Sequence, residues 1–462
     1  YFYRKADSKS LFTSSGREIK DYFKETVFEA IQRRKGRMNE SDRKLQCNLI
    51  RWSLDISKLS EDDFINEKYN VEERKESQKE WREFAIEMAD KIKREAIWND
   101  EKTKVTWLAL KYSYEPRLDV QIGTCDYYLY EGLAGIILFM KAIQVSSGGY
   151  EDVCRAAENV LFEYTDSVYE GKQDPDSYYT GLYCGEGAIV YTYQTLFQFT
   201  GEQKYLFYAI KHAEILLRLV EYDKSIDILY GNAGAIIAFC GLYRITNNIK
   251  YLEYAKEAEK FLRHNLQIGK DGVFFCGHGM KKPCAGIAHG NSGLIFAYGQ
   301  LWKYAEEDKY GSVLLGLLRY ENMLFRGRKK GMKETDWKTS QLPSWCHGSL
   351  GILWTYSKLK EMTGTKFDPE TKMVLENGEK ILEKVVLRRS MGLCHGNFGN
   401  LFLMKECSEK LQLGSNITSN FEKNVKKLLS EEILLMPKEQ LDYGLMQGIS
   451  GVGYACLRLQ KR

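Results

Sequence analysis

The stretch Ser344-Trp345-Cys346-His347-Gly348-Ser349-Leu350-Gly351 joins possible metal ligands to a Gly-x-x-Gly turn. A second stretch of the same form, Leu393-Cys394-His395-Gly396-Asn397-Phe398-Gly399, follows roughly fifty residues later. In both, an apolar or aromatic approach leads to small residues, and an apolar segment follows. This pattern indicates that the chain is built from repeats.

The Gly-x-x-Gly turn recurs from about residue 120 to the end of the chain. Its copies are Gly132 to Gly135, Gly231 to Gly234, Gly290 to Gly293, Gly348 to Gly351, Gly396 to Gly399 and Gly448 to Gly451, with a seventh, shortened copy at Gly185 to Gly187 that has one residue between its glycines.

These seven copies predict the fold. Glycine permits positive φ and close backbone approach, so each turn can start an inward-facing helix. A repeat of roughly fifty residues has room for two helices. Seven helical hairpins that each hide one face can close into a ring. We therefore expect an all-α protein, an α/α toroid of seven inner and seven outer helices with the glycine turns at one end of the central hole. An open solenoid is the alternative, and the atypical spacing and absence of polar caps favour closure.

Residues 1–75 differ from the repeats. Apolar residues at helical spacing predict a helix over Lys20 to Arg33, and Ser41-Asp42 would cap a second. The charged stretch 61–80 is interpreted as a linker or an exposed helix, and Trp81 to Ile97 as a further helix. We expect a helical segment with a linker at 1–75 and the toroid at 76–462.

Composition limits the function. The net charge of +4 over 462 residues does not favour a nucleic-acid partner, and the longest apolar runs are too short for a transmembrane segment. No secretory signal opens the chain, so the eleven cysteines indicate reduced thiols in the cytoplasm.

The basic runs 33–37 and 326–333 predict solvated loops, or docking sites for acidic segments. The first residue is Tyr1 and not Met, which suggests a piece of a longer protein.

The two Cys-His-Gly triplets offer two thiols and an imidazole. Zn²⁺ takes this set as two thiolates and one neutral imidazole, with a fourth position open to water or substrate. The alternative is two unrelated pairs, because cysteine is also a small core residue. Because the chain has only six histidines, the occurrence of two of them in Cys-His-Gly triplets argues against coincidence and favours a zinc site.

A closed ring would place further polar residues at the same mouth. His289 precedes the fourth glycine turn, and Asp227 lies four residues before the third. A carboxylate among apolar residues is costly to bury unless it is paired or catalytic. We expect a polar ring of Asp227, His289 and the Cys-His pairs. His278 is equally a loop residue or a substrate contact. Glu131, Cys184 and Gln447 hold the equivalent position in the first, second and last repeats. His212 and His264 are expected to be surface or core residues.

These motifs resemble the lanthionine cyclase family, from about residue 80 to the end. The segments 129–135, 444–446 and 457–459 are most similar to the C-terminal cyclase half of class II lanthipeptide synthetases, and 42–54 looks like the tail of the dehydratase domain that precedes it there. The resemblance implies zinc ligands at Cys346, Cys394 and His395, and an acid/base pair of His289 and Asp227. Class I cyclases have Tyr where His347 stands and Arg where Leu342 stands, so the group that holds the enolate is left open.

The resemblance also implies an activity. Zinc-bound cysteine thiolates of a precursor peptide would add to its dehydrated Ser or Thr residues by intramolecular Michael addition, with His289 or else His347 handling the proton. A dehydratase domain would lie upstream in the full-length protein. Zinc prenyltransferases are one alternative, although their site needs a carboxylate. A non-catalytic toroidal scaffold is another, with a structural zinc that binds peptides or thiols such as glutathione.

Overall fold

The computed structural model describes residues 1–56, 77–113, 119–326, 343–388, 390–429 and 442–460. Leu342, the charged residues 61–76 and most of the basic run 326–333 lie outside the described residues. The chain divides into two compact units, Tyr1–Ile65 and Asn66–Arg462.

The first unit holds three short antiparallel strands and two helices. The strands β1 (Phe2–Arg4), β2 (Leu11–Thr13) and β3 (Glu18–Ile19) form one sheet in that order. Helix α1 (Val27–Arg37) begins later than predicted because Thr26 and Glu29 form a reciprocal capping box. Helix α2 (Glu40–Ile56) begins earlier than predicted: Asn39 and Asp42 exchange backbone-to-side-chain hydrogen bonds of 2.9 and 3.1 Å, so Ser41-Asp42 is not the cap.

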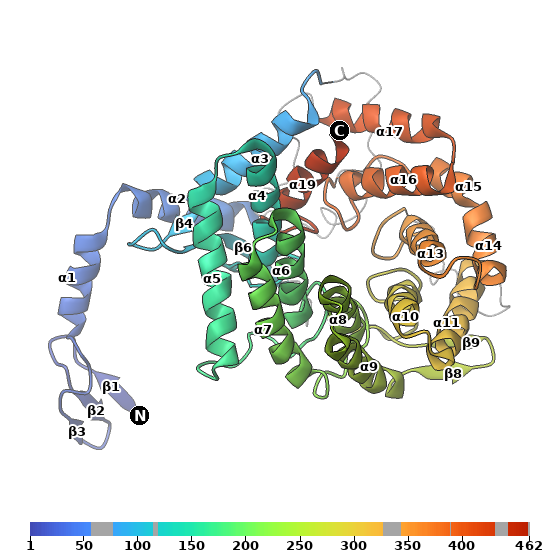
Figure 1. Ribbon diagram of the computed structural model, residues 1–462. Coiled ribbons are helices and arrows are strands. Elements are labelled where there is room, and N and C mark those ends of the chain that lie inside the picture. The colour runs from blue at the N-terminus through green and yellow to red at the C-terminus, as the bar shows by residue number, and fades with distance from the viewer. Residues whose placement is uncertain (57–76, 114–118, 327–342, 389, 430–441, 461–462) are drawn as a thin grey trace. The chain divides into compact units, whose positions relative to one another are not determined.

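In the second unit, seven helices of the described part start immediately after the first glycine of a turn, and that glycine is the N-cap in each. They form the inner layer of a ring (Figure 1). These helices are α4 (Leu133–Ser147), α6 (Glu186–Thr200), α8 (Asn232–Thr246), α10 (Asn291–Ala305), α13 (Ser349–Thr363), α16 (Asn397–Leu411) and α19 (Ile449–Leu459).

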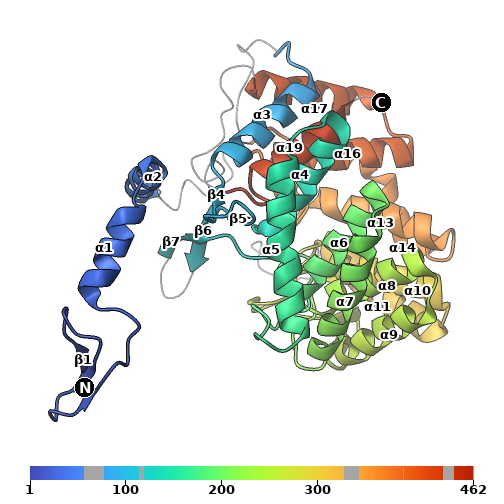
Figure 2. The ribbon, with the colours of Figure 1, turned by 60° about the vertical axis from the view of Figure 1, so that its left-hand side comes forward.

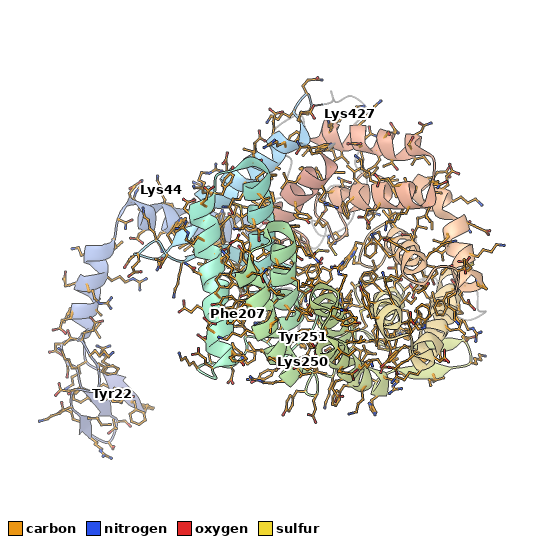
Figure 3. All side chains as sticks on the ribbon, in the orientation of Figure 1. Tyr22, Lys44, Phe207, Lys250, Tyr251 and Lys427 are labelled. Atoms are coloured by element: carbon orange, nitrogen blue, oxygen red, sulfur yellow. The ribbon has the colours of Figure 1, made fainter. Side chains whose placement is uncertain are left out.

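An outer layer covers them. Its helices are α5 (Glu151–Tyr169), α7 (Gln203–Leu219), α9 (Ile249–His264), α11 (Asp308–Arg326), α14 (Asp368–Glu376) with α15 (Gly378–Glu383), α17 (Ser415–Leu428) and α3 (Trp81–Arg94). The turned view shows α5 and α7 alongside α4 and α6 (Figure 2). Side chains of the outer helices reach the surface (Figure 3): Phe207 on α7 is 60% exposed, and Lys250 on α9 is also exposed.

The ring is closed. The last inner helix, α19, packs against the first, α4, and also against α3. Helix α3 therefore supplies the outer partner of the seventh repeat from the opposite end of the sequence. The Met446 N–H donates to the Tyr130 carbonyl at 3.0 Å across the seam. The predicted all-α toroid is confirmed, and the open solenoid is wrong.

The described residues of the second unit also form three short hairpin strand pairs that were not predicted. The helix expected to reach Ile97 ends at Arg94, because β4 (Ile97–Trp98) pairs with β5 (Val105–Thr106). The other pairs are β6 (Leu108–Ser113) with β7 (Asp119–Thr124), and β8 (Gln267–Gly269) with β9 (Gly272–Phe274). These three hairpins are separate from one another and form no layer of the fold.

Close approach explains the second glycine of the turns. A Cβ on Gly399 would lie 1.9 Å from the Leu393 carbonyl oxygen, and one on Gly451 would lie 1.9 Å from that of Leu445. Neither glycine has positive φ. The missing side chain thus matters because each helix start presses on the chain that precedes it.

The layer between inner and outer helices is largely apolar but encloses several polar clusters, one of them centred on Glu186. Glu186 is fully buried and accepts hydrogen bonds from Tyr128 and Tyr164, each at 2.7 Å, while His212 contacts it at 2.8 Å. His212 is thereby a core residue, and His264 is an exposed one whose ring contacts the Lys260 carbonyl. None of the helices in the described ranges has the length and apolar character needed to cross a bilayer.

Candidate functional site

Backbone hydrogen bonds bring the glycine turns together at the N-terminal ends of the inner helices. The Trp345 and Cys346 N–H groups donate to the Cys394 carbonyl at 3.0 and 3.3 Å, and the Cys394 N–H donates to Met446 at 2.8 Å. The Ala288 N–H donates to the Cys346 carbonyl at 2.9 Å, which joins the fourth turn to the fifth. Residues far apart in sequence are therefore neighbours at this mouth.

Three predicted metal ligands lie together. The ligand atoms of Cys346, Cys394 and His395 all fall within 4.8 Å of one another. Cys394 is buried, and the other two are half-buried. The ligand atoms of one tetrahedral zinc lie about 3.5 to 3.8 Å apart, which this spacing can accommodate. The donor set of two thiols and one imidazole fits zinc, and the cluster contains no carboxylate.

The thiols of this region differ in their protonation. A hydrogen bond from the Cys394 thiol holds the pKa of Cys346 well below its usual range, and His395 and His347 act in the same direction against the effect of burial. Burial instead raises the pKa of Cys284 to about 12, and it raises that of Cys184 well above the usual value. These shifts favour the thiolate form at Cys346, the form that binds a metal, and the protonated form at Cys284 and Cys184.

Asp227 and His289 form a direct pair. The His289 Nδ1 lies 2.8 Å from Asp227 Oδ2, and Asp227 is fully buried. The carboxylate also accepts the backbone N–H groups of His278 and Tyr230, each at 2.8 Å, so the buried acid is satisfied. Because a carboxylate accepts, the proton of neutral His289 is assigned to Nδ1, and Nε2 is left with a free lone pair.

His347 connects the pair to the thiols. Its ring stacks on that of His289 at a centroid distance of 5.6 Å and an interplanar angle of 25°. Burial lowers the pKa of His347, while the neighbouring Cys346 raises it. The candidate site residues from the sequence therefore lie next to one another. They are the possible metal ligands Cys346, Cys394 and His395 and the residues Asp227, His289 and His347.

Two contributors were not predicted in these roles. Tyr230 stacks between His278 and His289, with ring centroids 4.6 and 6.0 Å away. Tyr230 stands directly before Gly231, the position that His289, His347 and His395 hold in their turns, and this register could have identified it. His278 acts through its backbone N–H on Asp227, and no side-chain pattern could reveal that.

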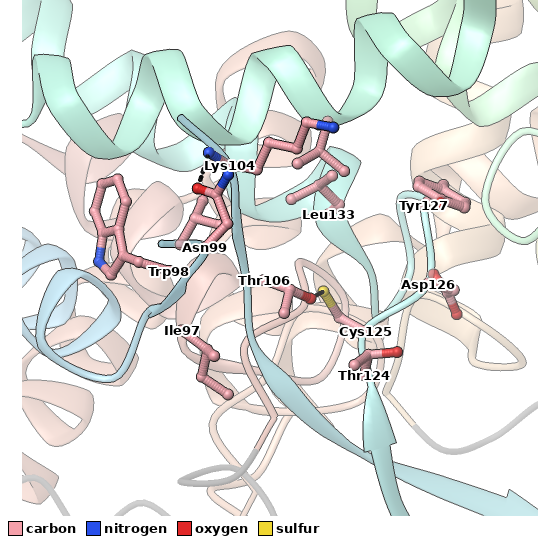
Figure 4. A pocket seen from close by; sticks show the side chains of 12 residues that line it. Ile97, Trp98, Asn99, Lys104, Thr106, Thr124, Cys125, Asp126, Tyr127 and Leu133 are labelled. Carbon is pink, nitrogen blue, oxygen red and sulfur yellow. Dashed lines mark hydrogen bonds between the residues drawn. The ribbon is translucent and has the colours of Figure 1, made fainter. Parts of the chain in front are cut away.

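Two cavities flank the turns. One of about 430 Å³ lies inside the ring, between Trp345 and Tyr183 near the turns and Arg244 and Lys303 near the far ends of α8 and α10. The other, of about 360 Å³, lies between the β4–β5 hairpin, the end of β7 and α4; its walls include Trp98 and Cys125, whose sulfur is 3.6 Å from Thr106 Oγ1 (Figure 4). None of the six site residues lines either cavity.

Comparison with known proteins places the repeats in a family. Residues 124–462 match the model of the lanthionine synthetase C-like proteins. The "Lacticin 481/lactococcin biosynthesis protein LcnDR2" of Lactococcus lactis subsp. lactis is 24% identical over 493 aligned positions, which cover 100% of this chain and 49% of that protein. The chain thus spans about half the length of that relative.

Two further similarities are partial or distant. The "Glutathione S-transferase LANCL1" of Danio rerio is 28% identical over 117 residues, 25% of this chain and 28% of that protein. Among solved structures, nisin cyclase aligns with a TM-score of 0.53 at 16% identity, covering 72% of this chain and 88% of that one. At this identity the structural match supports the fold alone.

Proposed function

The chain belongs to the lanthionine synthetase C-like family, and from this premise we propose that it is a zinc-dependent lanthipeptide cyclase. Its substrate is a ribosomal precursor peptide that carries free cysteines together with dehydroalanine or dehydrobutyrine, made by dehydrating Ser or Thr. The reaction is an intramolecular Michael addition that yields lanthionine or methyllanthionine rings.

Cys346, Cys394 and His395 would hold the zinc ion. When bound, zinc would take the substrate cysteine in its fourth position and keep it as a thiolate near neutral pH. The support for this assignment is the donor set, the ligand spacing and the thiolate character of Cys346.

His289 handles the protons. The substrate thiol loses its proton, the C–S bond forms at Cβ of the dehydroamino acid, the π electrons move toward Cα and its carbonyl, and Cα then takes a proton. His289 Nε2 is suited to accept the thiol proton and to give a proton to Cα, since Nδ1 is held by Asp227 at 2.8 Å. Asp227 fixes the ring and stabilises its charged form. His347, stacked on His289, is the second candidate for the proton donor.

One observation carries the proposal: the thiol–imidazole cluster and the Asp–His pair lie at one mouth, linked by the His347–His289 stack. A prenyltransferase is disfavoured because the cluster lacks a carboxylate. A non-catalytic scaffold that binds thiols such as glutathione is the second candidate, and the partial match to a protein named as a glutathione S-transferase supports its thiol ligand but not its lack of catalysis.

The setting of the domain is part of the proposal. Because the chain spans about half of its bacterial relative, we expect a dehydratase domain upstream in the natural protein, with residues 1–75 as its tail and linker. We place the protein in the cytoplasm, since its eleven cysteines form no disulfide in the described structure and a reducing compartment keeps thiols in this form.

The test uses two substrates. A cysteine-containing peptide that has already been dehydrated should lose alkylatable thiol without a change in mass, faster than the enzyme-free control. The unmodified precursor should lose neither thiol nor water, even with ATP and Mg²⁺. A scaffold would bind the dehydrated peptide or glutathione and leave the thiol count unchanged, and that result would overturn the cyclase.

A further inference from the structure

A short segment before the fourth turn runs along the candidate site. The Ala288 N–H donates to the Cys346 carbonyl at 2.9 Å. Two residues earlier, Gly286 has a φ of +105°, and a Cβ there would lie 2.6 Å from the Cys346 carbonyl oxygen and 2.6 Å from the Cα of His347. Only glycine allows this conformation and this close approach. The segment 284–289, here called the strap, therefore fixes how close the fourth turn comes to the fifth.

A buried carboxylate of an outer helix holds the strap. Glu321 of α11 is fully buried, and its Oε1 accepts the Gly286 N–H at 3.2 Å and the Ser292 hydroxyl at 2.5 Å. Gly286 stands three residues before His289, and Ser292 stands three residues after it. One oxygen atom thus ties the chain on both sides of the histidine that pairs with Asp227.

The second oxygen of this carboxylate argues against a role in stability alone. Within the described ranges, Glu321 Oε2 is buried and has no hydrogen-bond partner. A buried polar atom without a partner costs free energy, so an apolar side chain would pack α11 against α10 more favourably. What the carboxylate supplies in addition is direction, because both donors must point at Oε1.

We propose that Glu321 is a positioning residue for His289 and acts by holding the strap. The inference deepens the proposed function and rests on the proton-handling role of His289 given there. His289 needs its Nδ1 on Asp227, 2.8 Å away, and its Nε2 open to the substrate. Both depend on where the backbone of the strap places the imidazole ring, and a displacement of about 1 Å can lower a rate roughly a hundredfold.

The alternative is that Glu321 only packs two helices together. Glu259 of α9 offers a matched control, because it is also a buried carboxylate of an outer helix that binds a hydroxyl of α10: the Tyr298 hydroxyl donates to it at 2.9 Å. Its other partner is Arg263, 3.4 Å away. In the part of the chain that the structure describes, no hydrogen bond or ion pair joins Glu259 to the strap. Glu259→Leu therefore removes a similar contact and leaves the strap in place.

The experiment observes His289 directly. Histidine rings are labelled with ¹⁵N in the full chain, and the signals of the six histidines are recorded by NMR, with those of His289 assigned from His289→Asn. We expect Glu321→Leu to shift or broaden the His289 signals and to slow single-turnover cyclisation about 10- to 100-fold, with zinc content unchanged. Glu321→Gln keeps an accepting oxygen and should recover the rate to within about threefold of wild type. Glu259→Leu should leave the His289 signals in place.

Ser292→Ala keeps the test decisive if circular dichroism shows that Glu321→Leu does not fold. It removes one of the two donors, so the His289 signals should move in the same direction and the rate should fall by a smaller factor. With an active wild-type protein, unchanged His289 signals or an unchanged rate in the folded variant would mean that Glu321 only packs helices, and the inference would be wrong. The same holds if Glu259→Leu shifts the His289 signals as strongly. If the wild-type protein cyclises no dehydrated peptide, the proposed function falls, and the His289 signals alone decide whether Glu321 positions this residue.

Discussion

Asp227→Asn is the sharpest test of proton handling, because it changes one charge and almost no volume. The wild-type carboxylate receives three donors at 2.8 Å: the His289 ring and the backbone N–H groups of His278 and Tyr230. An asparagine has one accepting oxygen and one donating NH₂ group. In either orientation, the NH₂ group faces at least one backbone N–H and leaves it unsatisfied.

The magnitude follows from this count. An unsatisfied buried donor should lower the free energy of unfolding by about 1 to 3 kcal/mol. Loss of a hydrogen bond to a charged group, about 1.5 to 3 kcal/mol, removes support for protonated His289 and corresponds to a rate lowered about 10- to 150-fold. If the NH₂ group turns toward His289, the imidazole proton moves to Nε2 and the effect should rise toward the 10⁴-fold loss of a general acid or base.

The assay follows the loss of alkylatable thiol in single turnovers, together with zinc content and urea unfolding. Asp223→Asn is the control: Asp223 is also buried and accepts backbone N–H groups from Thr180 and Ser225, at 2.7 and 2.8 Å, without contacting His289. It should lose stability and keep its cyclisation rate. A wild-type rate in Asp227→Asn with full zinc would refute the charge-support role, and loss of zinc would show that Asp227 serves the metal instead.

Three further outcomes are expected. His289→Asn should retain zinc and slow cyclisation by roughly a hundredfold or more, since it removes the proton carrier; loss of its zinc would make His289 a ligand. Cys394→Ala should lose most zinc and remain helical by circular dichroism, and full zinc by metal analysis would contradict its assignment. Burial raises the pKa of Glu321 to about 7 from 4.5, so the folded state binds the proton more tightly and this group costs stability as pH rises across that window. Glu321→Gln should remove this loss, up to roughly 3 kcal/mol by urea unfolding at pH 5 and pH 8; identical pH profiles for the two proteins would contradict it.

The repeats could be predicted from the sequence because each one depends on a local steric requirement. A glycine is required wherever the helix start presses on the preceding chain, as at Gly399 against the Leu393 carbonyl, and this requirement marks each turn in the sequence. Each turn lies at the N-terminal end of an inner helix, so the polar residues of all the turns lie at the same end of the ring, independently of side-chain packing. The grouping of Cys346, Cys394 and His395 therefore followed from register alone.

Other features depend on contacts that register does not encode. Helix α3 precedes the repeats in the sequence, yet it covers α19, because closure joins the two ends of the unit. Gln447 and Tyr130 meet across the same seam, and their hydrogen bond depends on side-chain rotamers. The strands β1 to β3 are too short for a strong alternating pattern, so a helical prediction extended back toward them.

Within each turn, the positions that build the fold are separate from the positions to which the proposed function assigns chemistry. The second glycine cannot change without a clash with backbone atoms, as Gly399 and Gly451 show. The residue before the first glycine has no such restriction, and the seven turns place there Glu131, Cys184, Tyr230, His289, His347, His395 and Gln447. One backbone arrangement thus presents seven side chains of five kinds at a single mouth. A toroid of this kind keeps its architecture at 16% identity to nisin cyclase. Under the proposed function, the chemistry at its mouth would be set by these positions together with Cys346, Cys394 and Asp227.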